Sequence, residues 1–246
     1  MSLQACAELV SRGDPDRFAA VMAAPPAARA RLFPLYAFNL EVARAPWASK
    51  EPMIAEMRLQ WWRDVVAEPA PRAHEVAGPF HAVIHEAGLP LDVIDALIAA
   101  RIGDAYGAGF EDGAAFDAYL EDTGASLMWL AAKACGGTDE PAARALGWAA
   151  GLANYLRAVP ELEARGRHPL PDGRAEAVRD LVLQGLEKLA AAKGRVPKAA
   201  ALAAWQTGGL LRQVRHDPHL VAAGDMGLSE FARRWGLLRA AVTGRI

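Results

Sequence analysis

Residues 31–39 read Arg-Leu-Phe-Pro-Leu-Tyr-Ala-Phe-Asn, and residues 56–63 read Glu-Met-Arg-Leu-Gln-Trp-Trp-Arg. Both stretches combine helix formers with aromatic residues, and neither alternates apolar and polar residues as a half-buried strand does. The rest of the chain is similar, because Ala, Leu, Arg and Glu dominate it and no run of alternating β-branched residues interrupts them. The two stretches therefore predict helices, and the chain as a whole is predicted to be all-α.

Proline, glycine and acidic residues indicate where the helices begin and end. Asp14-Pro15 predicts the start of one helix, and Pro25-Pro26 separates it from the next. The predicted helices cover residues 27–45, 51–66, a segment around 81, 91–103, 114–134 and 139–159, with a basic loop over 164–173 and two or three helices after it. No linker rich in Gly, Ser or Pro divides the chain, so we expect a single domain, residues 1–246, of about ten helices.

The charge balance argues against a nucleic-acid partner. The chain has 27 Lys and Arg against 29 Asp and Glu, a formal net charge of −2, whereas proteins that bind phosphate backbones usually carry a strong basic excess. The N-terminus lacks a basic segment followed by an apolar one, and charges interrupt the apolar stretches before the ~20 residues that a membrane span needs. We expect a cytoplasmic protein, and a peripheral position at the inner face of a membrane is a further hypothesis.

Three stretches, in this order, resemble the squalene/phytoene synthase family. The first is the pair quoted above, which resembles the LYAF and RLxWWR helices of that family. The second runs from Tyr119 to Gly124-Ala-Ser-Leu127. The third is Leu146-Gly-Trp-Ala-Ala-Gly-Leu-Ala-Asn-Tyr-Leu-Arg157, followed by Gly166-Arg-His-Pro-Leu-Pro171. The resemblance covers residues 27–171 and implies a type I isoprenoid (terpenoid) synthase fold, a helical bundle around a central cavity.

The resemblance also implies what an active member needs at the mouth of this cavity. Two Asp-rich motifs face each other there, and their carboxylates hold Mg²⁺ ions against the leaving diphosphate. Carboxylates at positions i and i+4 point from one face of a helix, so that one motif can hold the same metal cluster. In this chain the four corresponding positions carry Ala43, Trp47, Ala158 and Leu162.

The loss of these acids predicts a non-catalytic protein without a metal cofactor. Pro46 and Pro160 fall within the two motif segments, and each is expected to end or kink its helix. Glu41 and Glu161 remain nearby, which leaves one alternative open: an active, Mg²⁺-dependent head-to-head prenyltransferase with rearranged ligands.

Within the family, the chain resembles a branch with degenerate motifs, the mitochondrial complex I assembly factor of the squalene/phytoene synthase-like type. The segments that carry this likeness include AFNLEVA, MRLQWW, YLEDTGASLMWL and LRAVP. It implies a membrane respiratory complex, or its assembly intermediates, as the partner.

Arginines near the second motif are the candidates for a retained binding function. Arg157, Arg165 and Arg167 can bind phosphate groups bidentately without a metal, so they are candidates for holding a diphosphate or a lipid head. The alternative is that these arginines belong to a solvated basic loop without a ligand. If they do bind a head group, an apolar isoprenoid or lipid would occupy the cavity. The candidate residues that line the cavity are Tyr36, Asn39, Glu41, Trp61 and Asn154.

Overall fold

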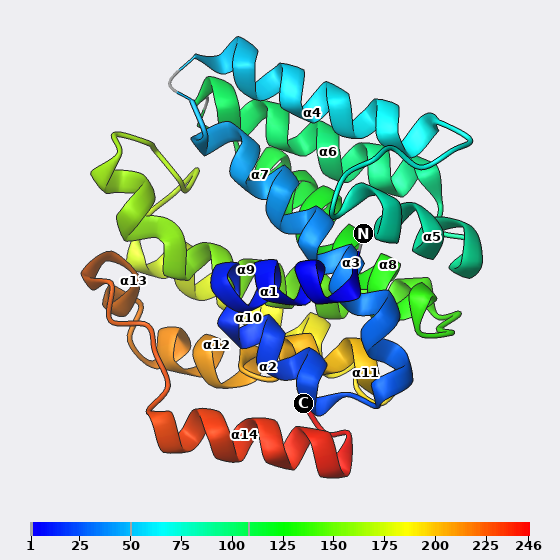
Figure 1. Ribbon diagram of the computed structural model, residues 1–246. Helices are drawn as coiled ribbons and strands as arrows, with labels where there is room; N and C mark the ends of the chain where they lie inside the picture. Colours follow the sequence, from blue (N-terminus) through cyan, green and yellow to red (C-terminus); the bar gives the residue numbers. More distant parts are fainter. Residues whose placement is uncertain (1, 50, 108) are drawn as a thin grey trace.

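The structure is a computed structural model that describes residues 2–49, 51–107 and 109–246 (Figure 1). Every regular element in these ranges is helical, so the all-α prediction is confirmed. In chain order the elements are α1 (Leu3–Gly13), α2 (Pro15–Ala23), α3 (Pro26–Arg44), the 3-10 turn η1 (Ala45–Trp47), α4 (Pro52–Ala67), α5 (Ala77–Ala87), α6 (Leu91–Tyr106), α7 (Gly113–Leu120), the π-helical turn η2 (Glu121–Ala125), α8 (Ser126–Ala134), α9 (Glu140–Ala164), α10 (Ala175–Ala191), α11 (Lys198–Ala201), the 3-10 turn η3 (Leu202–Ala204), α12 (Thr207–His216), α13 (His219–Ala223) and α14 (Glu230–Thr243).

The middle of helix α3 is buried on all sides, which is typical of a helical segment that is apolar around its whole circumference. Every residue from Leu32 to Leu40 is buried. Phe38 stacks on Phe80 of α5, with ring centroids 4.1 Å apart, and meets Trp62 of α4 edge-on at 5.2 Å. In Figure 1, α3 descends across the centre of the molecule, with α4 and α6 lying above it. The stretch that predicted the fold therefore forms the centre of the core.

Helix ends follow the signals in the sequence at several places. The side chain of Asp14 accepts a hydrogen bond from the Arg17 backbone N–H at 2.9 Å, and Pro15 occupies the first turn of α2. Asp139 caps α9 in the same way, through the Ala142 N–H at 3.1 Å. These caps satisfy backbone donors that an isolated helix start leaves unpaired.

Helix α9 is long, with 25 residues, and packs against η2, α10 and α8. It runs past Pro160 to Ala164, so of the two expected effects, an end or a kink, this proline does not end the helix, whereas α3 does end at Arg44, two residues before Pro46. Its Gly147 faces Gly124 of η2 so closely that a Cβ on Gly147 would overlap the Gly124 carbonyl oxygen. The two backbones approach because neither residue has a side chain.

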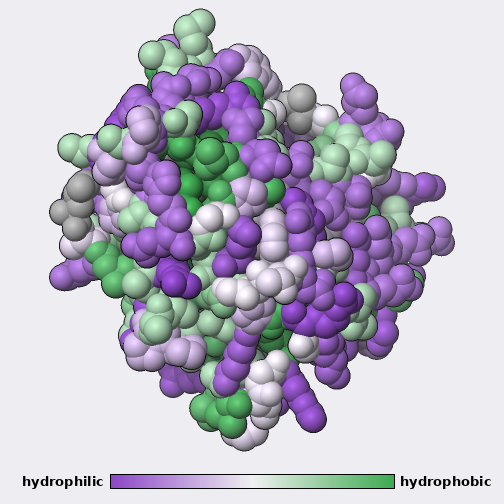
Figure 2. Space-filling view, turned by 90° about the vertical axis from the view of Figure 1, so that its right-hand side faces the viewer, coloured by the Kyte–Doolittle hydropathy of each residue, from purple (hydrophilic) through white to green (hydrophobic). Residues whose placement is uncertain are grey.

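Helix α14 lies at the outer edge of the molecule, below α2 and α12 in Figure 1. Ala240 is its one residue that is buried, at 2% exposure. Figure 2, which views the molecule from the right-hand side of Figure 1, shows hydrophilic residues over much of the face, a hydrophobic patch in its upper part and a small hydrophobic protrusion at its lower edge, the level at which α14 lies in Figure 1. Among the described residues, no helix is both long and apolar enough to cross a bilayer.

Candidate functional site

A cavity of about 600 Å³ lies where the C-terminal ends of α3, α6 and α9 meet. The loop after α9 and one residue of α7 complete its wall. The lining residues are Ala43, Arg44, Trp47, Arg101, Asp104, Gly107, Phe110, Tyr119, Tyr155, Ala158, Glu161, Leu162, Arg165, Arg167, His168 and Pro169. Four guanidinium groups and two carboxylates belong to this wall, so its charge favours an anion.

The structure brings together all four positions at which the resemblance places metal-binding carboxylates. Ala43 and Trp47 reach the cavity from α3 and η1, and Ala158 and Leu162 reach it from α9. The two segments are more than a hundred residues apart in the chain, and they meet at one cavity as the resemblance implies. The side chains that they present are aliphatic or aromatic.

Trp47 lies against two cations of the loop after α9. The guanidinium carbon of Arg165 is 4.9 Å from the centroid of the Trp47 ring, and that of Arg167 is 5.5 Å from it. Guanidinium groups are attracted to the negative face of an indole at such distances. Arg165 also forms an ion pair with Glu161, at 2.5 Å between Nη2 and Oε1. The ring thus holds the two arginines at the cavity wall.

The end of α9 places Arg167 by a Schellman motif. The Gly166 N–H donates to the Glu163 carbonyl at 2.8 Å, the Arg167 N–H donates to the Leu162 carbonyl at 3.0 Å, and Gly166 has φ +75°. The Arg167 side chain then donates to the Asp104 carbonyl at 3.2 Å. A glycine in the left-handed region therefore turns the chain so that Arg167 points back to the end of α6.

The opposite wall carries a hydrogen-bonded triad. Nη1 of Arg101 donates to Oδ2 of Asp104 at 3.1 Å and to Oη of Tyr119 at 2.5 Å, and Tyr119 donates to the same carboxylate at 3.0 Å. Burial opposes the charge of Arg101, but Tyr119 and Asp104 outweigh it and raise the Arg101 pKa. Burial also raises the pKa of Tyr119, which stays a neutral phenol.

Aromatic rings form the apolar part of the cavity. The Phe110 ring lies 5.3 Å from Tyr119 and 6.2 Å from Tyr155, and the two tyrosine rings are 5.8 Å apart. Tyr155 donates its hydroxyl to the Pro169 carbonyl at 2.8 Å, and its pKa is raised by burial. The cavity therefore combines an aromatic surface with arginines, which suits a ligand that has both an apolar and an anionic part.

The donor set does not fit a magnesium cluster. Mg²⁺ takes oxygen ligands from carboxylates, and the two that line the cavity, Asp104 and Glu161, are each ion-paired with an arginine. Within residues 2–49, 51–107 and 109–246, no three His, Cys, Asp or Glu side chains are grouped so that they could hold a metal ion.

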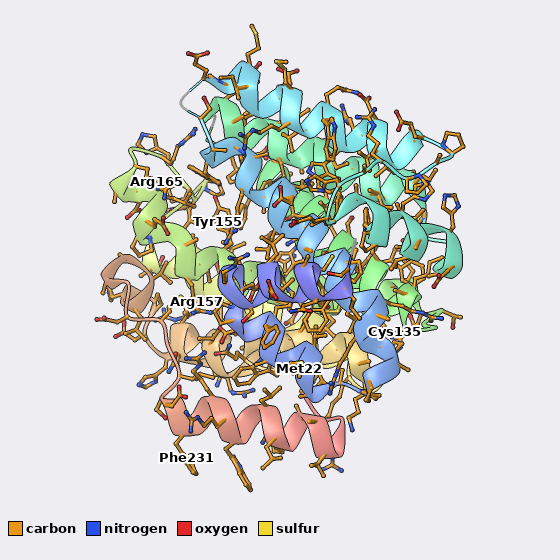
Figure 3. The ribbon with its side chains drawn as sticks, in the orientation of Figure 1. Met22, Cys135, Tyr155, Arg157, Arg165 and Phe231 are labelled. Atoms are coloured by element: carbon orange, nitrogen blue, oxygen red, sulfur yellow. The ribbon has the colours of Figure 1, made fainter. Side chains whose placement is uncertain are left out.

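Six residues that the sequence indicated lie away from this cavity. Arg157, although adjacent to Ala158, forms an ion pair with Asp16 of α2 at 3.4 Å, because successive helical residues point about 100° apart. Figure 3 shows Arg157 and Arg165 in separate places. The other five were predicted to line the cavity, and the structure places none of them on its described wall: Tyr36, Asn39, Glu41, Trp61 and Asn154.

Side-chain packing explains why four of these residues lie away from the cavity. Tyr36 and Asn39 are enclosed in the core around α3, at 2% and 7% exposure. Trp61 packs on the loop after α4, where its ring is 5.1 Å from His74. Asn154 lines a separate pocket of about 60 Å³ beside Arg157 and α2. The lining residues that sequence reasoning missed include Arg101 and Asp104, whose i, i+3 spacing in an otherwise apolar helix was the available signal.

Comparison with solved structures identifies the fold. The structure matches the crystal structure of a dehydrosqualene synthase in complex with ligand, with a TM-score of 0.78 over 98% of this chain and 95% of that chain, at 12% sequence identity. The fold is thus that of a type I isoprenoid (terpenoid) synthase. The squalene/phytoene synthase sequence profile matches residues 10–178. The chain belongs to the squalene/phytoene synthase family.

Curated relatives carry a different description. A Drosophila melanogaster homolog of NADH dehydrogenase (ubiquinone) complex I, assembly factor 6, is 32% identical over 195 residues, which is 74% of this chain and 56% of the relative. The Homo sapiens assembly factor 6 is 26% identical and the Bos taurus one 27% identical, each over 172 residues, which is 68% of this chain and 52% of the relative. The chain spans about half the length of these relatives.

Proposed function

We propose that this chain is a non-catalytic member of its family that takes part in the assembly of a respiratory NADH dehydrogenase. The observation that carries the proposal is the composition of the cavity mouth: Ala43, Trp47, Ala158 and Leu162 meet there, and two arginines lie on Trp47. Without acids at these positions, nothing there would bind Mg²⁺ to activate a diphosphate leaving group. The names of the similar proteins supply the assembly role.

We further propose that the cavity binds an isoprenoid or lipid with an anionic head. Arg165 and Arg167 would hold the head without a metal, and the rings of Phe110, Tyr119 and Tyr155 would contact the apolar chain. The protein would work in the cytoplasm, peripheral to the inner face of the membrane, where such ligands and the respiratory complex are both available.

The first experiment separates binding from catalysis. The purified protein is incubated with farnesyl diphosphate, once with Mg²⁺ and once with EDTA, and both pyrophosphate release and the melting temperature are measured. We expect no release in either case and a higher melting temperature in both, because a ligand of the folded state stabilises it. Turnover with Mg²⁺ would contradict the proposal and favour the alternative, a prenyltransferase with rearranged ligands.

A double variant tests the head-group site. The double variant Arg165→Glu, Arg167→Glu should abolish the rise in melting temperature. It replaces the two cations that lie on Trp47 with two negative charges, which repel an anionic head group. Arg174→Glu is the matched control, since Arg174 is a surface arginine, 82% exposed, and lies outside the cavity. If the double variant still responds as the wild type does, the head group binds elsewhere.

The assembly role has its own test. Deletion of the gene in its source organism should lower the amount of assembled NADH dehydrogenase, and the wild-type gene should restore it. Complementation with the gene of the Arg165→Glu, Arg167→Glu variant tests whether the amount of assembled complex depends on these two arginines of the cavity. Normal levels of assembled complex after deletion would overturn the assembly role and leave the ligand-binding proposal standing.

A further inference from the structure

The outer face of α14 carries an exposed apolar stripe. It consists of Phe231, Trp235, Leu238 and Val242, which are 77%, 56%, 55% and 73% exposed. Steps of four, three and four residues place these side chains on one side of the helix. Figure 3 shows Phe231 at the outer edge of the molecule. Large apolar side chains gathered on one exposed face indicate an interaction surface.

The stripe is not needed to attach α14 to the rest of the molecule. The opposite side of the helix does this, through Ala240, Leu237 and Ala241, which pack into the cluster formed by Ala20, Ala24 and Leu202. Arg233, on the same inner side, hydrogen-bonds Asp16 of α2. The helix is therefore held in place by one face while the other offers aromatic and aliphatic side chains to a partner.

Basic residues flank the stripe and continue beyond its end. Arg234 and Arg239 lie on either side of it, since they follow Phe231 by three and eight residues and are rotated by about 60–80° in opposite directions. Residues 230–246 contain four arginines and one glutamate, in a chain whose net charge is −2. The segment is therefore a local basic region on an otherwise slightly acidic protein.

A second cavity, of about 350 Å³, adjoins the C-terminal end of the stripe. Its described lining holds four cations and no acidic side chain: Lys193, Arg212, Arg239 and Arg245, with Thr243 and Ile246 between them. Within the described parts of the chain, no ion pair joins any of these four cations to a carboxylate. Such a group of arginines and lysine suits a phosphate.

We propose that α14 docks the protein on an anionic lipid bilayer. The helix lies in the plane of the surface, its apolar stripe enters the boundary between head groups and acyl chains, and the basic cavity beside it takes a lipid phosphate. Charge complementarity selects this occupant, because Arg239 borders the stripe and the cations of the second cavity lie at its end, whereas Arg234 is ion-paired with Glu230 at 2.8 Å. The inference rests on the peripheral membrane position proposed above but not on the ligand of the larger cavity, and α14 lies beyond residues 10–178 that the family profile matches.

Vesicle binding by the full chain tests the proposal. Vesicles of phosphatidylcholine with phosphatidylglycerol are compared with vesicles of phosphatidylcholine alone, and bound protein is separated by flotation. We expect binding to the anionic vesicles, weakened by salt, and much weaker binding to the neutral ones. Leu238→Glu should weaken binding on the order of tenfold or more, and Arg239→Gln and Arg245→Gln by about fivefold each.

The control is a matched change on another exposed apolar side chain. Met53 is 70% exposed, and its helix α4 lies at the end of the molecule opposite α14 in Figure 1. Met53→Glu should bind vesicles as the wild type does. Thermal denaturation checks folding, and Trp235→Gln replaces Leu238→Glu if the latter lowers the melting temperature. The proposal is overturned if the wild type does not float with anionic vesicles, if the stripe variants float as well as it does, or if Met53→Glu loses binding equally. The stripe would then face a protein.

Discussion

Trp47 changes the chemistry of the cavity more than the loss of one acid would. A carboxylate at this position would attract a metal ion and repel an anion, whereas the indole ring is neutral and carries two guanidinium groups on its face. The same place in the fold can therefore attract a phosphate directly. Glu161 limits this effect, because it already forms an ion pair with Arg165.

Gly107 is predicted to be essential for the position of Arg167. It has φ +73°, and a Cβ at this position would overlap the Arg167 guanidinium. Gly107→Ala should lower the free energy of unfolding by roughly 1–2 kcal/mol for the left-handed backbone alone, with a further loss from moving the arginine. Urea denaturation measures this, and the thermal response to farnesyl diphosphate should weaken as well.

Gly88→Ala is the control for this prediction. Gly88 also has a positive φ, +59°, but a Cβ there would meet no atom within 4 Å. It should show the backbone cost and an unchanged response to the ligand. An equal loss of ligand response in both variants would mean that Gly107 does not act through Arg167.

Sequence reasoning found part of this site for a physical reason. Ala43, Trp47, Ala158 and Leu162 could be located because a resemblance in order and spacing assigns positions even when the side chains have changed. The Arg101–Asp104–Tyr119 triad could not, because Tyr119 comes from another helix and the three meet only where α6 packs against η2, the turn that continues α7. For Tyr36 and Asn39 the sequence could not separate the two environments, because burial in the core and lining of a cavity give the same pattern.

At the scale of elements, one carboxylate adds ionic contacts to the apolar packing that holds α14 against the body. Asp16 of α2 interacts with Arg233 of α14 and with Arg157 of α9, at 3.4 Å for the latter. Burial acts to raise the pKa of Asp16, but hydrogen bonds from Gln206 and Arg233 and the charge of Arg157 outweigh it, so that the pKa is lowered. A carboxyl whose pKa is lower in the folded state stabilises the fold when it is ionised.

Asp16→Asn should therefore destabilise the protein in a pH-dependent way. Near neutral pH the loss should be about 1 kcal/mol, a figure that allows for the partial exposure of the arginines. The stabilisation is complete above the pKa of an unfolded aspartate, about 3.9, and is lost as the pH falls through the lower pKa of the folded state. Urea denaturation at neutral and acidic pH should show the difference between variant and wild type shrinking on acidification. Asp180→Asn, at an exposed site, should show no such trend.

The contact between α9 and η2 predicts a second effect at this scale. Gly147→Ala would place a Cβ onto backbone atoms of Gly124 and Ala125, and backbone cannot move aside as a flexible side chain can. Overpacking of this kind should lower the free energy of unfolding by roughly 1–3 kcal/mol. Gly103→Ala in α6, where a Cβ would meet no atom within 4 Å, should instead be neutral or stabilising because alanine favours a helix. Thermal denaturation should show a lower melting temperature for Gly147→Ala and an unchanged or higher one for Gly103→Ala.

The positions at which helices begin were the structural feature best predicted from the sequence. Asp14-Pro15, Pro25-Pro26 and Asp139 act locally, so that their effect can be read without the tertiary structure. The π-helical turn η2 within the predicted helix 114–134 was missed, and the packing of Gly124 against α9 coincides with it. The extension of α9 past Pro160 was also missed. A proline removes one hydrogen bond, and a long helix packed along its length can tolerate that loss.

At the scale of the whole molecule, the two cationic cavities belong to different regions. One lies at the ends of α3, α6 and α9, and the other lies beside α14. Distant sites without shared partners act additively. A variant that combines Arg165→Glu, Arg167→Glu and Leu238→Glu should therefore lose vesicle binding and ligand stabilisation by the same factors as the separate variants. Vesicle flotation and thermal denaturation measure the two losses, and a departure from additivity would show that the sites are coupled.

The 3-10 turn after Arg44 has a consequence for any attempt to restore a metal-binding motif at this place. Positions 43 and 47 would share a helix face only if α3 continued to Trp47, but the helix ends at Arg44 and Pro46 lies in the turn that follows. Aspartates reintroduced at these two positions would not regain the parallel arrangement that a motif of this spacing provides. Restoring the two acids alone would leave this turn in place. The helix would have to continue past Arg44 before this spacing could present both carboxylates on one face.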